Sequence, residues 1–357
     1  MSKVHNFSAG PGILPQEVLK QASDACINFD GLNLSLLEIS HRSKNYENVI
    51  EESQSIIKEL FEVGNDYEVI YLGGGASLQF AMVPYNLLTD KGYAAYVNTG
   101  VWASKAIKEA KIIGNTKVIA SSEDRNFNYI PKGYEIPTDA DYLHITSNNT
   151  IFGTQLKQFP KTNIPLVCDM SSDIFSRKVN AKDFSLIYAG AQKNMGPAGS
   201  TMIMVKKDAL GKTGRKMLSM LDYQVHIKGG SMYNTPPVFP IYVTLLTLQW
   251  LKKNGGIAWI EKINQQKADC LYNEIDRNTL FVGTTAVEDR SHMNACFLTT
   301  KPELEAEFDK LWKDANISGI RGHRDVGGYR ASMYNALPLE SVQVLVGVMK
   351  EFEKKFA

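Results

Sequence analysis

Short apolar runs alternate with helical segments between residues 67 and 205. Several of these runs are apolar at consecutive positions, as strands are when helices cover both faces of their sheet. They cover residues 67–72, 93–97, 116–120, 142–146, 165–168, 185–189 and 201–205. This alternation predicts an α/β domain built on a large, mainly parallel, seven-stranded sheet.

The pattern changes near Gly255-Gly256. Beyond this point two helical stretches alternate with two strand-like segments before a last helix, in the order 257–275, 294–299, 302–316, 329–334 and from about 339. We therefore predict a large domain over 13–256 and a smaller α+β domain over 257–357. Helical periodicity also predicts helices at 14–29 and 46–61, ahead of the first strand.

Composition narrows the class of protein. The chain has 357 residues, 44% of them hydrophobic and 22% charged, with a net charge of +1. This balance is typical of an ordinary globular protein and gives no electrostatic reason to expect nucleic acid or a membrane as partner. The four cysteines form no CxxC pair, the six histidines form no HExxH, and no signal peptide or membrane span is visible. We expect a cytoplasmic enzyme without a zinc site or a disulfide framework.

Lys193 is the first candidate for chemistry. An apolar run at 185–189 leads into its loop, and Gly196, Pro197 and Gly199 exclude both helix and regular strand after it. A lysine in a rigid loop at the end of a buried strand loses water and gains a fixed geometry. Both conditions lower the pKa of an amine and make it a nucleophile toward aldehydes. A surface lysine with no role is the alternative at this point.

Asp169 strengthens the catalytic interpretation, because it follows the preceding apolar run, 165–168. A carboxylate at the end of one buried strand and a lysine just past the next is the pair that pyridoxal phosphate (PLP) requires. The lysine bonds to the aldehyde, and the carboxylate keeps the pyridine nitrogen protonated so that the ring withdraws electrons.

Three motifs carry a resemblance to a known family: NFSAGPG at 6–12, AGAQKNMGPAGS at 189–200 and GGYRAS at 327–332. With them the chain resembles the phosphoserine aminotransferase family, PLP enzymes of the class V aminotransferase group, over essentially its whole length. The resemblance implies the type I fold of PLP-dependent transferases. It also implies that residues 1–12 pack on the small domain.

The Gly-rich segment 73–77 follows the first predicted strand and precedes a helix expected at 78–88. Backbone N–H groups at a helix N-terminus bind anions, although the segment alone is as consistent with a structural turn. It is not a dinucleotide fingerprint, because GxGxxG needs a glycine in place of Leu78. The resemblance implies that Ala76 and Ser77 bind the PLP phosphate.

The resemblance also assigns the other cofactor contacts. It implies that Trp102 stacks on the ring, that Thr150 bonds to the ring oxygen and that Gln192 lies beside the lysine. It further implies that Asn234 and Thr235 reach the phosphate from the partner subunit of a homodimer. Taken without the family, these residues would be interpreted as core packing or as turns.

The substrate contacts are basic residues beside glycines. Planar guanidinium groups suit carboxylate and phosphate, and the resemblance gives these roles to His41, Arg42, His323, Arg324 and Arg330. It implies transamination between L-glutamate and 3-phosphohydroxypyruvate in serine biosynthesis, and it leaves open a phosphohydroxythreonine step of vitamin B6 synthesis. Some members carry an arginine where this chain has Ser77, so part of the substrate-phosphate contact is unassigned.

Two other functions are consistent with parts of the pattern. A cysteine desulfurase shares the cofactor chemistry but needs a mobile loop cysteine, whereas Cys296 lies in an apolar run that predicts a buried thiol. A non-catalytic nucleotide-binding protein would have no chromophore and would not depend on Lys193. The colour of the purified protein separates this last class from the others.

Overall fold

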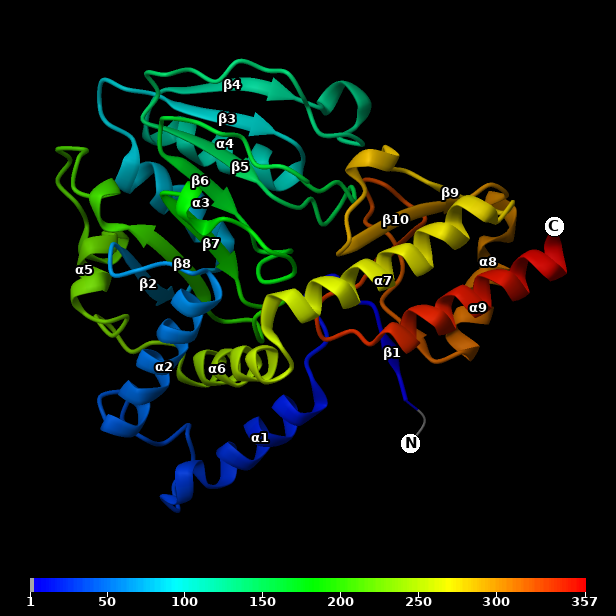
Figure 1. Ribbon diagram of the computed structural model, residues 1–357, viewed down its shortest axis with the longest axis horizontal. Helices are drawn as coiled ribbons and strands as arrows, with labels where there is room; N and C mark the ends of the chain where they lie inside the picture. Colours follow the sequence, from blue (N-terminus) through cyan, green and yellow to red (C-terminus); the bar gives the residue numbers. More distant parts are fainter. Residues whose placement is uncertain (1–2) are drawn as a thin grey trace.

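A seven-stranded sheet forms the centre of the computed structural model, which describes residues 3–357 (Figure 1). The strand order is β2-β8-β7-β6-β5-β3-β4. Strand β8 pairs antiparallel with both neighbours, and the other neighbouring strands are parallel. The strands are β2 (Tyr67–Leu72), β3 (Ala94–Asn98), β4 (Thr116–Ser121), β5 (Tyr142–Thr146), β6 (Leu166–Asp169), β7 (Leu186–Gly190) and β8 (Thr201–Lys206).

Helices cover both faces of this sheet. Side chains alternate between faces along a strand, so Val167 packs in the core beneath α3 and α4, whereas Leu166 and Cys168 pack in the core beneath α2 and α6. Helix α1 lies outside α6 (Figure 1). The helices of this part are α1 (Gln16–Ile27), α2 (Lys44–Leu60), α3 (Gly75–Leu87), α4 (Val101–Ile113), α5 (Tyr223–Lys228) and α6 (Val238–Lys253).

A second core forms around a three-stranded antiparallel sheet of order β12-β10-β9. Strand β1 pairs in parallel with β11, so the N-terminal segment lies against this second part and Phe7 is buried in its core. The elements are β1 (His5–Asn6), α7 (Gly256–Arg277), β9 (Phe281–Gly283), β10 (Asn294–Thr299), α8 (Glu305–Asp314), β11 (Ile317–Ser318), β12 (Tyr329–Ser332) and α9 (Leu339–Phe356).

Helix α7 runs from the end of α6 to the small sheet (Figure 1). Ile260, in its first half, belongs to the core of the large sheet, and Leu271 and Ile275, in its second half, belong to the second core. One helix therefore packs in both cores, and the domain boundary at residue 256 stays a prediction.

The predicted α/β class and its large, mainly parallel sheet are confirmed. The differences lie at element ends and in elements that the sequence pattern does not predict, namely helices α5 and α6 and the short strands β1, β9 and β11. Strand β6 continues to Asp169, because this residue still pairs with Tyr188 of β7, and helix α3 begins at Gly75, before the predicted start. Helix α6 was not predicted, since its apolar residues surround the helix and leave no period to detect.

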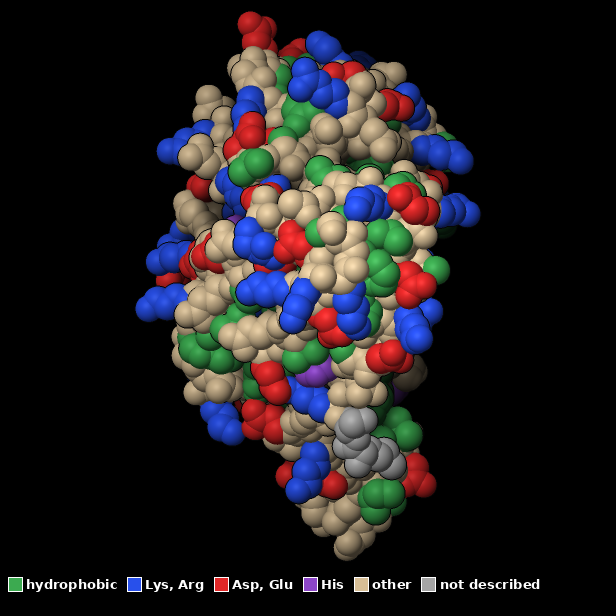
Figure 2. Space-filling view, turned by 90° about the vertical axis from the view of Figure 1, so that its right-hand side faces the viewer, with side chains coloured by type: hydrophobic (Ala, Val, Ile, Leu, Met, Phe, Trp, Pro, Cys, Tyr) green, Lys and Arg blue, Asp and Glu red, His purple; other side chains and the backbone are tan. Residues whose placement is uncertain are grey.

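Charged side chains of both signs are interspersed over the face shown in Figure 2, as the net charge of +1 leads us to expect. Across residues 3–357, no helix has the length and apolar character needed to cross a membrane. Within the same range, no three His, Cys, Asp or Glu side chains gather as a metal-ligand group.

Candidate active site

Lys193 lies in a tight turn between β7 and β8. Its backbone N–H donates to the Ala191 carbonyl at 2.7 Å. Gly196 packs so closely on α6 that a Cβ there would lie 2.6 Å from Thr244 Oγ1, so a larger residue does not fit. The Lys193 side chain is held at its far end, where Nζ donates to Thr150 Oγ1 at 2.9 Å.

The surroundings of Lys193 favour a neutral amine. Burial is the main cause that lowers the pKa of Lys193 to about 8; Asp169 opposes this change and Arg330 adds to it. An amine with this pKa is partly deprotonated near neutral pH and is a nucleophile there. The property expected from the loop sequence is therefore present in the folded chain.

Asp169 is the last residue of β6 and is 5% exposed. The Ser171 N–H donates to its Oδ1 at 2.9 Å. Burial raises the pKa of Asp169, and the Ser171 hydrogen bond and Lys193 act in the opposite direction. A carboxylate held in this way can hold a proton on a nitrogen base brought next to it.

A cavity of about 290 Å³ brings these groups together. It opens at the carboxyl ends of β5, β6 and β7, where open α/β sheets bind ligands. Nine of the predicted site residues line it: Ala76, Ser77, Trp102, Thr150, Asp169, Gln192, Lys193, His323 and Arg330. Eight further residues complete the lining: Ala9, Gly10, Gly75, Thr146, Asn148, Ile151, Ser171 and Ser172.

Two parts of the lining can bind anions. The first turn of α3, Gly75 to Ser77, presents the free backbone N–H groups of a helix N-terminus, which bind anions. Arg330 of β12 also lines the cavity and donates from Nη1 to the Thr150 carbonyl at 3.1 Å. Its buried Nε has no partner within the described chain and stays available for an anionic ligand.

Five predicted site residues do not line this cavity in the single chain. Arg42 and Arg324 are exposed, with the Arg324 side chain 91% exposed. Asn234 and Thr235 are also exposed, in the loop before α6. His41 is half-buried, and its Nε2 is buried without a partner among residues 3–357. Their contacts with substrate or cofactor stay predictions.

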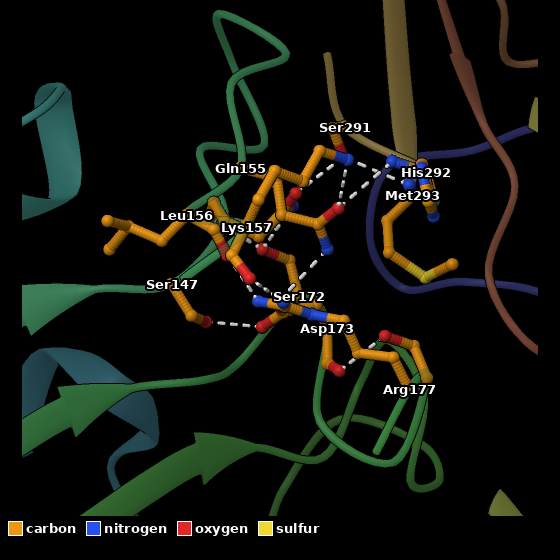
Figure 3. A network of polar contacts seen from close by, with 12 residues as sticks. Ser147, Gln155, Leu156, Lys157, Ser172, Asp173, Arg177, Ser291, His292 and Met293 are labelled. Carbon is orange, nitrogen blue, oxygen red and sulfur yellow. Dashed lines mark hydrogen bonds and ion pairs between the residues drawn. The ribbon is translucent and has the colours of Figure 1, made fainter. Parts of the chain in front are cut away.

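Figure 3 shows a buried polar network among residues that follow β5 and β6. Its centre is Asp173, whose carboxylate contacts Ser147 Oγ and accepts from Gln155 Nε2 at 3.1 Å and from Arg177 Nη2 at 3.3 Å. The Ser147 hydroxyl lies 3.0 Å from the Asp169 carbonyl, to which the Ser147 N–H also donates. The network therefore fixes the backbone from which the Asp169 side chain leaves the sheet.

The lining fits PLP. An amine, a buried carboxylate and a helix N-terminus match the aldehyde, the ring nitrogen and the phosphate of this cofactor. Lys193 Nζ lies 5.8 Å from the centroid of the Trp102 ring, which leaves an aromatic wall beside the amine. Besides Arg330 Nε, two buried polar atoms of the lining, Trp102 Nε1 and Thr146 Oγ1, have no partner among the described residues. Both are open to hydrogen bonds with a ligand.

Cys296 does not have the environment of a catalytic thiol. It is 2% exposed in β10, and its Sγ lies 3.3 Å from the Ile151 carbonyl. Burial raises the pKa of Cys296 to about 12, so the thiol stays protonated and unreactive. The desulfurase alternative therefore lacks its nucleophile at this position.

The fold and this cavity define an aminotransferase of class V. Residues 4–345 match the model of the class-V aminotransferase family. The chain is 64% identical over 354 residues to the phosphoserine aminotransferase of Flavobacterium psychrophilum, covering 99% of both chains.

Solved structures agree with this result. Phosphoserine aminotransferase from Bacillus circulans subsp. alkalophilus has a TM-score of 0.96 at 43% identity, with 99% of each chain covered. The PLP-bound phosphoserine aminotransferase from Trichomonas vaginalis has a TM-score of 0.92 at 33% identity, covering 98% of this chain and 100% of that one. The chain belongs to the phosphoserine aminotransferase family.

Proposed function

We propose that the chain uses PLP to transfer the amino group of L-glutamate to 3-phosphohydroxypyruvate, giving O-phospho-L-serine and 2-oxoglutarate in serine biosynthesis. The observation that carries this proposal is the meeting of Lys193, Asp169 and Arg330 in one cavity that a helix N-terminus also lines. Membership of the family supplies the substrate names.

Each residue then has a task. Lys193 would hold the aldehyde of PLP, and its Nζ would carry the substrate α-proton. Asp169 holds the proton on the ring nitrogen, and Trp102 covers the ring. Gly75, Ala76 and Ser77 bind the phosphate. When bound, PLP supplies the ring that accepts the electrons of the broken C–H bond.

The other cofactor contacts follow the family. Thr150 bonds to the ring oxygen, and Gln192 lies beside the lysine. Asn234 and Thr235 complete the phosphate site from the partner subunit of a homodimer. Because these two residues are exposed in the single chain, a monomer should bind PLP poorly. If light scattering shows that the fully active enzyme is a monomer, the proposed homodimer is wrong.

We assign substrate recognition to the basic side chains. Arg330 binds the α-carboxylate that every substrate carries, and His41, Arg42, His323 and Arg324 bind the phosphate. A substrate with a carboxylate and a phosphate dianion needs two separate cationic groups. Some family members have an arginine at the position of Ser77, and this chain lacks that contact to the substrate phosphate. The same substrate site would accept the phosphohydroxythreonine substrate of vitamin B6 synthesis. The four free cysteines support a reducing, cytoplasmic setting.

Steady-state rates with two keto acids test the substrate. We expect 3-phosphohydroxypyruvate to exceed hydroxypyruvate in kcat/KM by about a hundredfold, because charge-assisted bonds to the phosphate contribute a few kcal/mol. Arg330→Ala should weaken the half-reactions of both substrates, whereas His323→Ala should weaken mainly the phosphorylated one. Equal kcat/KM values for the two keto acids in the unmodified enzyme would exclude the proposed substrate.

A second measurement tests the assignment of Lys193. The purified protein with PLP should be yellow and should lose this colour with borohydride, leaving the cofactor bonded to the peptide that contains Lys193. Attachment to Lys206 or Lys212 instead would contradict the assignment.

A further inference from the structure

A fully buried lysine lies in α7, outside the cavity. Lys267 is 0% exposed, and its Nζ donates to three backbone carbonyls: Met333 at 3.0 Å, Tyr334 at 2.8 Å and Leu337 at 3.1 Å. All three belong to the connection between β12 and α9, which we call segment 333–337. The Lys267 side chain therefore binds three carbonyls within one short segment of backbone.

The charge of Lys267 has no acidic partner. None of the ion pairs among residues 3–357 includes it, and burial alone lowers the pKa of Lys267 to about 7. Burying an unpaired ammonium is costly, and an apolar side chain of the same size would fill the space without this cost. The specific contribution of the ammonium is its set of bonds to the three carbonyls.

One turn earlier in α7, Asn264 holds the same segment. Its Nδ2 donates to Asn335 Oδ1 at 2.9 Å and to the Ser176 carbonyl at 2.9 Å, and Asn264 is 1% exposed. Lys267 and Asn264 are an i,i+3 pair on one helix face. Together they bind segment 333–337 through both its backbone and a side chain.

Segment 333–337 in turn contacts the chain on two sides of Lys193. The Asn335 N–H donates to Asn194 Oδ1 at 2.9 Å, and Asn194 is the next residue after the lysine. Tyr334 Oη donates to the Ala9 carbonyl at 2.6 Å. Residues 9–12 pass beside the lysine, where a Cβ on Gly10 would lie 3.8 Å from Lys193 Cε.

Arg330 lies in β12, the strand that leads directly into this segment. The anchored segment therefore connects the strand that carries Arg330 with the turn that carries Lys193. We propose that Lys267 and Asn264 are positioning residues, which hold segment 333–337 and thereby fix the lysine amine relative to the arginine. Neither residue lines the cavity, so both act through Asn194 and Tyr334. The consequence for catalysis rests on the proposed transamination.

Lys267→Met tests this role, with Lys262→Met as the control, because Lys262 is exposed on the same helix. Small displacements of reacting groups cost up to about a hundredfold in rate. We expect kcat to fall ten- to a hundredfold in Lys267→Met and to stay unchanged in the control. Lys267→Arg, which keeps the charge and the donors, should recover part of the rate.

A double-mutant cycle with Asn194→Ala separates positioning from general destabilisation. If Lys267 acts through Asn194, the double variant should lose no more than the larger single loss, whereas independent effects multiply. Multiplied losses, or a folded Lys267→Met with the kcat of the unmodified enzyme, would overturn the proposal.

Acylation of Lys193 in the cofactor-free protein gives a readout that needs no substrate. Its rate should change at least threefold in Lys267→Met and stay constant in Lys262→Met; an unchanged rate contradicts the positioning role. If Lys267→Met does not fold, Asn264→Leu replaces it, and unmodified kcat and acylation there refute the proposal. Failure of the proposed substrates would instead appear in the unmodified enzyme and would leave the acylation result intact.

Discussion

The pKa of Lys193 gives a quantitative prediction for the cofactor-free protein. Burial lowers it to about 8, against 10.5 for an ordinary lysine. At pH 7 about a tenth of a group with pKa 8 is the neutral amine, compared with about 0.03% of an ordinary lysine, a difference of about 300-fold. Lys193 should therefore react with an acylating reagent at pH values where surface lysines are almost inert.

Competitive labelling with trace acetic anhydride measures this property directly. The extent of acetylation of each lysine peptide is followed by mass spectrometry between pH 6 and 11. Lys193 should reach half its maximal rate near pH 8, and the exposed Lys212 is the internal control at a higher pH. Asp169→Asn should move the midpoint of Lys193 downward, since the carboxylate raises this pKa.

A midpoint for Lys193 at pH 10 or above would refute the reasoning. It would mean that water reaches the amine freely, or that acidic groups outweigh burial. A midpoint near 8 that moves upward in Asp169→Asn would leave the burial argument intact but reverse the sign assigned to the carboxylate.

Four further predictions each concern one residue. Gly12→Ala should lower the free energy of unfolding by about 1–3 kcal/mol in denaturant titrations, because its Cβ would lie 2.7 Å from Tyr334 Cδ2; an unchanged midpoint would contradict the close approach. Asp169→Asn should reduce kcat at least a hundredfold while the protein stays folded, because the ring nitrogen loses its charged partner; near-normal turnover would remove its role. Cys296→Ala should keep transamination within about twofold, since this thiol is buried and protonated, whereas a large loss of kcat would restore a chemical role for it. Burial lowers the pKa of Lys267 to about 7 in the folded chain, against 10.5 for an ordinary lysine. Between these pH values the folded state holds fewer protons than the unfolded state, so the free energy of unfolding should rise from pH 7 to 9.5. Lys267→Met should flatten this rise in urea titrations.

The sequence by itself determined the fold class and the two central residues of the site. The strands Tyr67–Leu72 and Tyr142–Thr146 match the predicted runs to the residue, because strands covered by helices are apolar at most of their positions. Lys193 and Asp169 were identifiable for a related reason. Asp169 ends one buried strand and Lys193 lies in the turn after the next, so the local pattern also indicated the edge of the sheet on which each lies.

The resemblance predicted seven further lining residues, and tertiary structure alone decided those that neither the pattern nor the resemblance assigns. Ala9 and Gly10 join the lining although Lys193 is far along the chain, and Asn148 and Ser172 are residue types common in any loop. No local rule distinguishes them before the strands are paired. The same holds for Lys267, which looks like a surface lysine in the sequence of α7 until three carbonyls of segment 333–337 surround it.

The physical reason for this division is the separation along the chain of the residues that interact. Hydrophobic periodicity and loop stereochemistry act within a few residues, so a single sequence displays them. Contacts such as Tyr334 Oη to the Ala9 carbonyl join residues from the two ends of the chain. They form only when two cores and a shared helix have packed, because closing so long a loop costs entropy that local interactions do not offset.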